Sequence, residues 1–320
     1  MIARVLAVAL NAYREAVRAR TLHALLALAL ATCLYALLVA ALSIHEEPRV
    51  VADIGAASIS LYTDIVAIVL GSSTLHREIE HKTIVPMLTR ALRRHEYLVG
   101  KYLGTLITLA VFIALQGAAV LGVLAAGSGA ASAPGAAVAS VAFVAFAALA
   151  VLASVAWRMP RQRTYLAVPW SCGCFVAMAL LASNAAGEQR LVLASCALTF
   201  SEAAIVAGLA SFFASFSSPA LTAVFTLGVF VVGREAEALG NIPARPLGPI
   251  FGPLAHAAGK ALAHVVPNLN LYVPPRALLL GEVAGTSVWS FVAAAAQNAV
   301  MYTLLLLTMG TLLFRRRDFS

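Results

Sequence analysis

The chain has 320 residues, of which 62% are apolar and 11% charged, and its mean hydropathy is +0.91. Ordinary soluble domains carry about 25% charged residues, so a soluble protein of this composition is excluded and lipid must be the solvent for most of the chain. The net charge of +8 does not indicate nucleic-acid binding, because the basic residues form short clusters between apolar runs rather than one patch with interleaved aromatics. We therefore predict an all-α integral membrane protein.

Eight apolar segments are long enough, or nearly so, to cross a hydrocarbon core about 30 Å thick as helices rising about 1.5 Å per residue. The seventh is the shortest. The eight predicted spans are residues 22–44, 54–75, 102–126, 135–157, 165–183, 191–216, 219–233 and 289–314.

Lys and Arg in the connecting segments orient these spans, because cytoplasmic loops retain positive charge. With the N-terminus in the cytoplasm, sixteen of the 22 basic residues fall in cytoplasmic segments and six in external ones. No Lys or Arg is then left within a span. The sequence thus predicts that both termini are cytoplasmic, with external Arg49, Arg190, Arg234, Arg245, Lys260 and Arg276.

The first 21 residues predict an amphipathic helix on the cytoplasmic leaflet, with its arginines toward the lipid headgroups. Polar residues recur at spacings of seven, three and four, and apolar residues populate the other side. An ordinary cytoplasmic extension of the first span is the alternative. The polar set is Arg4, Asn11, Arg14 and Arg18, and the apolar set is Val5, Leu6, Leu10, Tyr13 and Val17.

Residues 76–101 form the longest and most charged cytoplasmic segment, HREIEHKTIVPMLTRALRRHEYLVGK. Acidic residues come first and basic ones later, which suits a helix macrodipole. An apolar stripe at helical spacing accompanies them, and Pro86 kinks or restarts the helix. The pattern is typical either of a solvated amphipathic loop or of a helix that docks on a soluble partner.

The one long external segment, residues 234–288, holds seven of the thirteen prolines and must be broken into short pieces. Residues 254–266 and 276–280 are expected to form short helices that dip into the outer interface.

Asp64 and Glu202 fall within predicted spans, where a charge is costly and indicates a function or a partner. Three interpretations are open: a hydrogen bond to a neighbour such as Tyr62, Thr63 or Ser201, a transport or proton-relay role, or pairing of the two acids. No phosphate-binding loop, HExxH pair or GxSxG elbow is present, so we expect no catalytic, cofactor or metal site in this chain.

The cytoplasmic segment resembles the signature of type-2 ABC transporter permeases through REIEHKT (77–83) and LTRALRRHEYLVGKYLG (88–104). That signature is approximately E-x-E-x-x-T, a leucine-rich stretch, R-P-x-x-R and then G-K-x-x-G. Further likenesses follow in the same order at residues 13–18, 215–219, 267–269 and 314–319. Ala91 stands where the family usually has Pro, and residues 135–183 add two spans to the usual six.

The resemblance implies a non-catalytic permease subunit of an ATP-driven exporter of the multidrug, lipid or copper-processing type, in the bacterial cytoplasmic membrane. Its implied partners are a separate ATPase subunit, a second permease copy or paralogue, and membrane lipid. The single domain, 1–320, would comprise an interface helix (1–21), spans 1–2 (22–75), a coupling helix (76–101), spans 3–7 (102–233), a re-entrant external segment (234–288), span 8 (289–314) and a tail (315–320). The implied coupling residues are Arg77, Glu78, Glu80, Thr83, Leu88, Arg90, Arg93, Arg94 and Glu96.

Two other functions compete with this one. An intramembrane enzyme would use Asp64, Glu202 or the histidines and turn over without an ATPase. An ion-coupled carrier would be built around the two acids and would run on a pH gradient without ATP.

Overall fold

The computed structural model describes residues 2–42, 47–80, 94–127, 163–240, 266–282 and 287–315, together with 257, 259, 260 and 285. Within these ranges the regular structure is helical throughout. The long helices are α1 (Ile2–Val17), α2 (Arg20–Leu42), α3 (Glu47–Glu80), α5 (Arg94–Gly127), α7 (Arg163–Leu181), α8 (Ala186–Ala214), α9 (Pro219–Arg234) and α13 (Val288–Arg315). The short ones are η2 (Ala182–Ala185), α10 (Ala236–Gly240), η3 (Leu269–Tyr272) and α12 (Arg276–Leu280).

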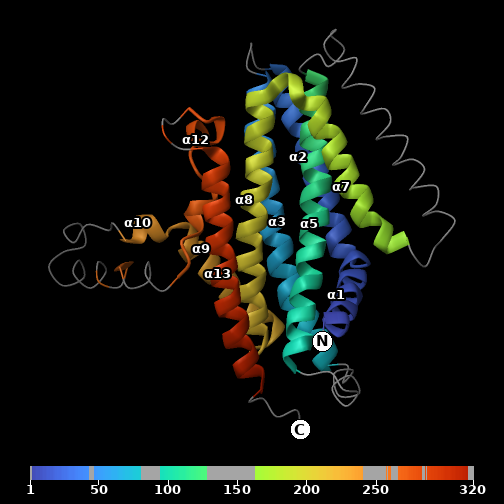
Figure 1. The fold of residues 1–320 in the computed structure, drawn as a ribbon, viewed down its shortest axis with the longest axis vertical. Helices are drawn as coiled ribbons and strands as arrows, with labels where there is room; N and C mark the ends of the chain where they lie inside the picture. Colours follow the sequence, from blue (N-terminus) through green and yellow to red (C-terminus); the bar gives the residue numbers. More distant parts are fainter. Residues whose placement is uncertain are drawn as a thin grey trace.

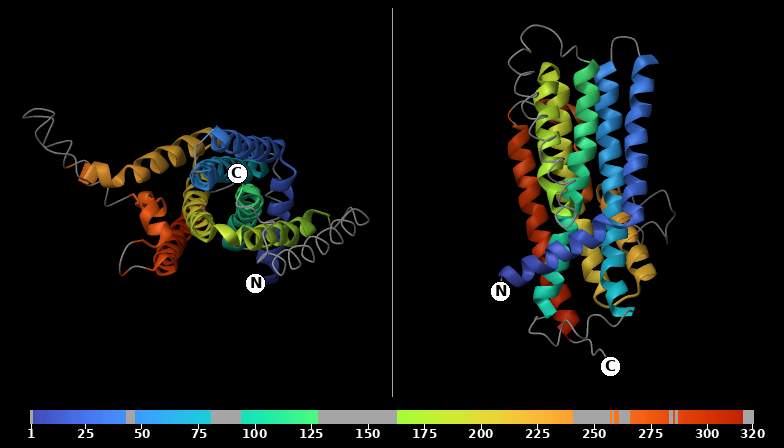
Figure 2. Two further views of the ribbon diagram at one scale, coloured as in Figure 1. Left: turned by 90° about the horizontal axis from the view of Figure 1, so that it is seen from above. Right: turned by 90° about the vertical axis from the view of Figure 1, so that its right-hand side faces the viewer.

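The long helices form one elongated bundle, in which α2, α3, α5, α8 and α13 run along the long axis (Figure 1). Helix α1 crosses the bundle near one end, which we call the α1 end (Figure 2). The start of α1 and the end of α13 lie toward this end, as do the end of α3 and the start of α5 (Figure 1). The opposite end, where η2 and α12 lie, is called the α12 end.

Five helical stretches are long and apolar enough to cross a membrane, which confirms the prediction of an all-α multi-span protein. They are Arg20–Ala40, Pro48–Ser72, His95–Ala126, Thr164–Ala214 and Val288–Leu313. The fourth has 51 residues and reverses direction at η2, so that α7 and α8 run in opposite directions (Figure 1). The predicted span 135–157 lies outside the described residues.

Helix α1 lies directly on α5, because two glycines of α5 remove the side chains that would separate the helices. A Cβ on Gly104 would lie 2.5 Å from the Ala9 carbonyl oxygen, and one on Gly100 would lie 2.6 Å from the Cβ of Val8. Between the glycines, Lys101 donates to the Glu15 carboxylate over 3.2 Å. The G-K-x-x-G motif therefore builds the α1–α5 contact, in the small-xxx-small manner of membrane helices.

The face of α1 that packs on the bundle consists mainly of alanines and one buried tyrosine, Tyr13, whose hydroxyl donates to the Thr164 carbonyl over 3.0 Å. Ile2 and Leu6 remain exposed. The predicted amphipathic helix exists, but its larger apolar side chains do not all face the protein. The small side chains allow close packing, which leaves Ile2 and Leu6 available for lipid.

Helices α3 and α8 form the centre of the bundle and approach closely at Gly71, where a Cβ would lie 2.3 Å from the Cβ of Ala210. Most of the middle of α8 is buried. The Tyr102 hydroxyl adds a 3.2 Å hydrogen bond from α5 to the Ala204 carbonyl. This central pair holds both intramembrane acids, Asp64 on α3 and Glu202 on α8.

Helix α9 has 16 residues and rises about 24 Å, which is less than the hydrocarbon thickness of about 30 Å. It begins at the α1 end and stops halfway along the bundle (Figures 1 and 2). Its end is covered by the chain at residues 267–269, which approaches closely because a Cβ on Gly233 would lie 2.8 Å from the Pro267 carbonyl oxygen. The seventh predicted span is therefore a helix of half the depth of the bundle.

The segment after α9 is broken as predicted, and α12 covers residues 276–280 as expected. Gly281 ends α12 in the left-handed conformation (φ 76°), which glycine adopts without strain. The Tyr272 hydroxyl ties η3 to α13 by a 3.2 Å hydrogen bond to the Ala295 carbonyl. The predicted helix at 254–266 lies almost entirely outside the described residues.

We predict that Gly104→Ala lowers the free energy of unfolding by about 1–3 kcal/mol, because the added methyl must push α1 away from α5. Thermal unfolding in detergent measures this effect. Gly228→Ala is the matched control, because a Cβ there meets nothing within 4 Å. That variant should be neutral or more stable by up to about 1 kcal/mol. Equal stability of both variants would contradict the packing described for α1.

Candidate functional site

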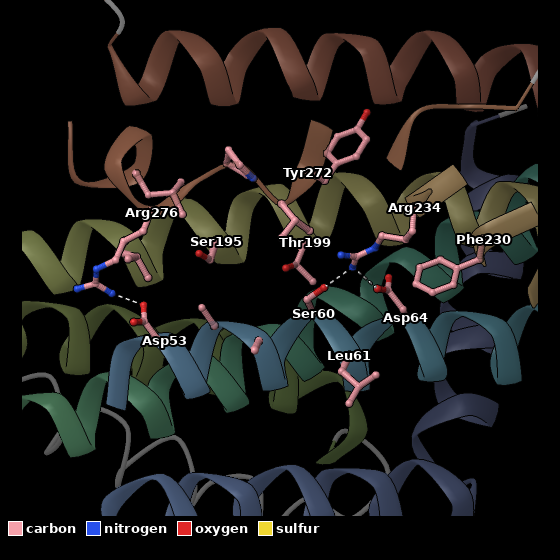
Figure 3. Close-up of a pocket in the computed structure, with 16 residues that line it drawn as sticks. Asp53, Ser60, Leu61, Asp64, Ser195, Thr199, Phe230, Arg234, Tyr272 and Arg276 are labelled. Carbon is pink, nitrogen blue, oxygen red and sulfur yellow. Dashed lines mark hydrogen bonds and ion pairs between the residues drawn. The ribbon is translucent and has the colours of Figure 1, made fainter. Parts of the chain in front are cut away.

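Arg234, the last residue of α9, joins the two intramembrane acids, and Figure 3 shows its contact with Asp64. Its Nη2 donates to the Asp64 Oδ2 over 3.2 Å and to the Glu202 Oε2 over 3.0 Å, and its Nε lies 2.8 Å from the Glu202 Oε1. The same Nη2 donates to the Ser60 hydroxyl over 2.7 Å. Phe230, one turn earlier, places its ring 5.4 Å from the guanidinium carbon. Three helices that are distant in sequence thus converge on one cation.

The three charged side chains of this cluster are removed from solvent to different extents. The side chains of Glu202, Asp64 and Arg234 are 0%, 3% and 25% exposed. Asp64 lies at the middle of α3 and Glu202 near the middle of α8. Carboxylates at this depth are tolerated only with a partner, and Arg234 supplies it.

Pairing through an arginine was not among the three interpretations of Asp64 and Glu202, and the expected hydrogen bonds to neighbouring residues are wrong. The Tyr62 hydroxyl bonds Thr32 on α2 over 2.8 Å, and the Ser201 hydroxyl donates to the Ala197 carbonyl within α8. The Thr63 hydroxyl is buried without a hydrogen-bond partner. None of these three hydroxyl groups makes a hydrogen bond to either acid, and both acids bond Arg234 instead.

Arg234 also corrects the charge count, which placed it in an external segment. That count treated residues 219–233 as a full crossing, whereas α9 ends at the depth of Asp64. The available signal was length, since an apolar run of about 16 residues followed by Arg is too short to carry that Arg across the bilayer. A basic residue at the helix C-terminus also suits the helix macrodipole.

A second arginine, Arg276 at the start of α12, joins the same two central helices nearer the α12 end. Its guanidinium pairs with Asp53 of α3 and with Glu188 in the first turn of α8. Arg49 lies 4.0 Å from the other oxygen of Asp53. Arg190 of α8 donates to the Leu280 carbonyl over 3.4 Å and so holds the end of α12 as well. Sequence reasoning placed Arg276 outside but identified none of these contacts.

Between the two arginine clusters lies a cavity of about 500 Å³ (Figure 3). Its walls are α3, α8, α9, α12 and the chain that follows η3. The lining is mainly apolar, with a few hydroxyl groups and the charged groups at either end, as in most small-molecule sites. The lining includes Asp53, Ser60, Leu61, Asp64, Ser195, Thr199, Phe230, Arg234, Tyr272, Val273, Arg276 and Leu279.

The residues implied in coupling to an ATPase lie around the junction of α3 and α5. Arg77, Glu78 and Glu80 belong to the last turns of α3, and Arg94 and Glu96 to the first turn of α5. Thr83, Leu88, Arg90 and Arg93 lie outside the described residues. Glu96 is buried and lies 4.0 Å from Arg4, so this carboxylate faces α1. The structure therefore separates the described members of this set, at the end of α3 and the start of α5, from Asp64 and Glu202, which lie at mid-depth.

Within the described part of the chain, no group of three His, Cys, Asp or Glu side chains is arranged to hold a metal ion. No known family model matches the chain, and no curated protein is similar to it.

We predict that Arg234→Met lowers the free energy of unfolding by about 3–5 kcal/mol, because it leaves two buried carboxylates without their cation. The triple variant Arg234→Met, Asp64→Asn, Glu202→Gln removes the charges together and should recover most of that loss. Thermal unfolding and gel filtration in detergent compare the two proteins. If the triple variant is no more stable than the single one, the ion pairs of Arg234 do not account for the loss of stability in Arg234→Met.

Proposed function

We propose that the chain is the membrane permease subunit of an ATP-driven exporter, in which a separate ATPase supplies the work. The observation that carries the proposal is the length of α3 and α5. Each has 34 residues, which rise about 51 Å and so exceed a hydrocarbon core of about 30 Å. The excess includes the charged residues at the α1 end, where α3 ends and α5 begins (Figure 1). A soluble partner bound there would displace two long helices, α3 and α5, that continue into the membrane.

The contact between α1 and α5 supports transmission of such a force. Lys101 near the start of α5 pairs with Glu15, and Glu96 lies beside Arg4. The Arg14 guanidinium stacks 4.8 Å from the Tyr165 ring of α7. Because α1 is bound to both helices, a displacement of the α3–α5 junction would move α1, α5 and α7 together, as in rigid-body switching.

The cavity lies beside the first half of α3, away from the α3–α5 junction. Helix α3 ends at the charged junction and contributes Asp64, Leu61 and Asp53 to the cavity. In this proposal, tilting of α3 changes the shape of the cavity, and export follows from alternation of its opening. The α1 end is cytoplasmic, as its basic residues indicate. A second permease copy and the bacterial cytoplasmic membrane belong to the same proposal.

The ion-coupled carrier is the second candidate, because two acids do meet at mid-depth. Arg234 contacts both of them, however, which fits a structural cluster at least as well as a relay. An intramembrane hydrolase would need an activated nucleophile or a metal beside these acids. Ser60 accepts a hydrogen bond from Arg234, and Phe230 places an apolar ring beside the same guanidinium.

We predict that the chain copurifies from detergent-solubilised membranes with an ATPase, and that Glu78→Lys or Arg93→Glu lowers ATP-dependent transport at least tenfold while leaving thermal stability unchanged. Both changes reverse a charge at the α3–α5 junction. The measurement is ATP-driven transport in proteoliposomes.

Glu282→Lys is the matched control, because this exposed acid lies just after α12, at the other end of the bundle. It makes the same charge change as Glu78→Lys and should transport normally. Normal transport by both junction variants would overturn the coupling role. Transport driven by a pH gradient in the absence of ATP would favour the carrier instead.

A further inference from the structure

We propose that the cavity between the two arginine clusters binds an amphipathic molecule with one cationic group, which is placed against Asp64. This inference rests on the proposed function, because it names the substrate class of that permease.

The cluster at the α12 end is neutral, and the one at mid-depth is not. At the α12 end, the guanidinium groups of Arg276 and Arg49 face the carboxylates of Asp53 and Glu188. At mid-depth, the single guanidinium of Arg234 faces Asp64 and Glu202, which gives a net charge of −1. Among the described residues, no second cation contacts this pair. A buried cluster with an uncompensated charge is costly.

One oxygen of the mid-depth cluster remains available to a ligand. The Asp64 side chain is 3% exposed and lines the cavity, yet its Oδ1 has no hydrogen-bond partner. Arg234 contacts the other oxygen, Oδ2. A buried acceptor without a partner is rare in native proteins, and here it can receive a donor that the described residues do not supply. An ammonium group at Oδ1 would supply the donor and bring the cluster to neutrality.

The rest of the cavity favours an apolar body of limited size. Leu61, Phe230, Val273 and Leu279 contribute apolar surface, and Ser195 and Thr199 contribute hydroxyl groups. A volume of about 500 Å³ lies within the usual range of about 300–1,000 Å³ for drug-sized ligands. It is much larger than a bare metal cation requires. The lining and volume therefore fit an organic amine rather than an inorganic ion.

The arginines do not favour an anionic ligand. Each guanidinium on the cavity wall already pairs with two carboxylates, so a phosphate or carboxylate ligand would have to displace acidic side chains or lie beside them. Beside Arg234, such a ligand would make the local net charge −2 instead of −1. The cavity thus distinguishes ligands by the sign of their charge, because it repels anions as well as attracting cations.

The test uses the chain alone in nanodiscs of phosphatidylcholine, whose zwitterionic headgroup has no net charge, without an ATPase. Three fluorescent probes share one dansyl group and one short alkyl chain, and they end in a primary ammonium, an acetamide or a carboxylate. Fluorescence titration gives the affinities, with empty nanodiscs defining partition into lipid. We expect the ammonium probe to bind at least tenfold more tightly than the acetamide and the carboxylate probe to bind most weakly.

Three variants assign any preference to Asp64. Asp64→Asn should lose the tenfold preference for the ammonium while binding the acetamide as before. Ala57→Leu fills the cavity without changing a charge, and it should weaken the ammonium and acetamide probes alike. Glu235→Gln removes an exposed acid next to Arg234 outside the cavity lining and should bind as the unchanged protein does.

Equal affinity for the ammonium and acetamide probes would overturn the inference and indicate that a proton neutralises the cluster. Tightest binding of the carboxylate probe would also overturn it. So would an unchanged preference in Asp64→Asn. If that variant does not fold, Ala57→Leu decides, because a preference that survives a filled cavity arises elsewhere. These results are separate from copurification with an ATPase, so the substrate class and the permease function can fail independently.

Discussion

The ion pairs that Arg234 makes with Asp64 and Glu202 constrain more of this structure than any other contact. Each carboxylate is buried near the middle of a long helix. The cation that neutralises them must therefore come to the same depth. A full-length helix ending in Arg would carry that residue past the acids, so α9 must stop halfway and the chain after it must turn back. The half-length helix, the close fit of Gly233 under Pro267 and the broken segment beyond it all follow from this one placement.

The same constraint creates the cavity. Because α9 ends at mid-depth, the space beyond it, between α3 and α8, is closed by the segment after η3 and by α12 rather than by another long helix. Arg276 secures that closure through Asp53 and Glu188. The two central helices are thus joined by an arginine at each end of the cavity, one at the end of α9 and one at the start of α12. A change in the tilt of α3 would disturb the ion pairs of both arginines. In the proposed permease, this links the charged α3–α5 junction to the cavity.

Much of the fold could be predicted from hydropathy, because the long apolar runs are set by bilayer thickness and need no knowledge of partners. The amphipathic α1 and the five-residue α12 were also accessible, since helical spacing and proline positions are local properties. The pairing of Arg234 was not, because it joins positions separated by 170 and 32 residues. Counting charges between spans assumed that every apolar run crosses fully, and the short run 219–233 violates that assumption. The acids were recognised as unusual from sequence, but their neighbours Tyr62 and Ser201 bond elsewhere, and only the packing of α3 on α8 determines which residue reaches them.

The depth at which α9 ends tests most directly whether Arg234 lies beside the two acids in the middle of the membrane. A spin label at Val231, which is exposed three residues before Arg234, reports that depth in a background where the native cysteines are replaced. Relaxation by dissolved oxygen, set against relaxation by a water-soluble nickel complex, measures distance from the bilayer centre, with a label at Leu221 near the start of α9 as the reference. If α9 ends at mid-depth, the Val231 label lies close to the bilayer centre and deeper than the Leu221 label. A Val231 label as accessible to the nickel complex as a label in an aqueous loop would place Arg234 at the membrane surface and contradict the account.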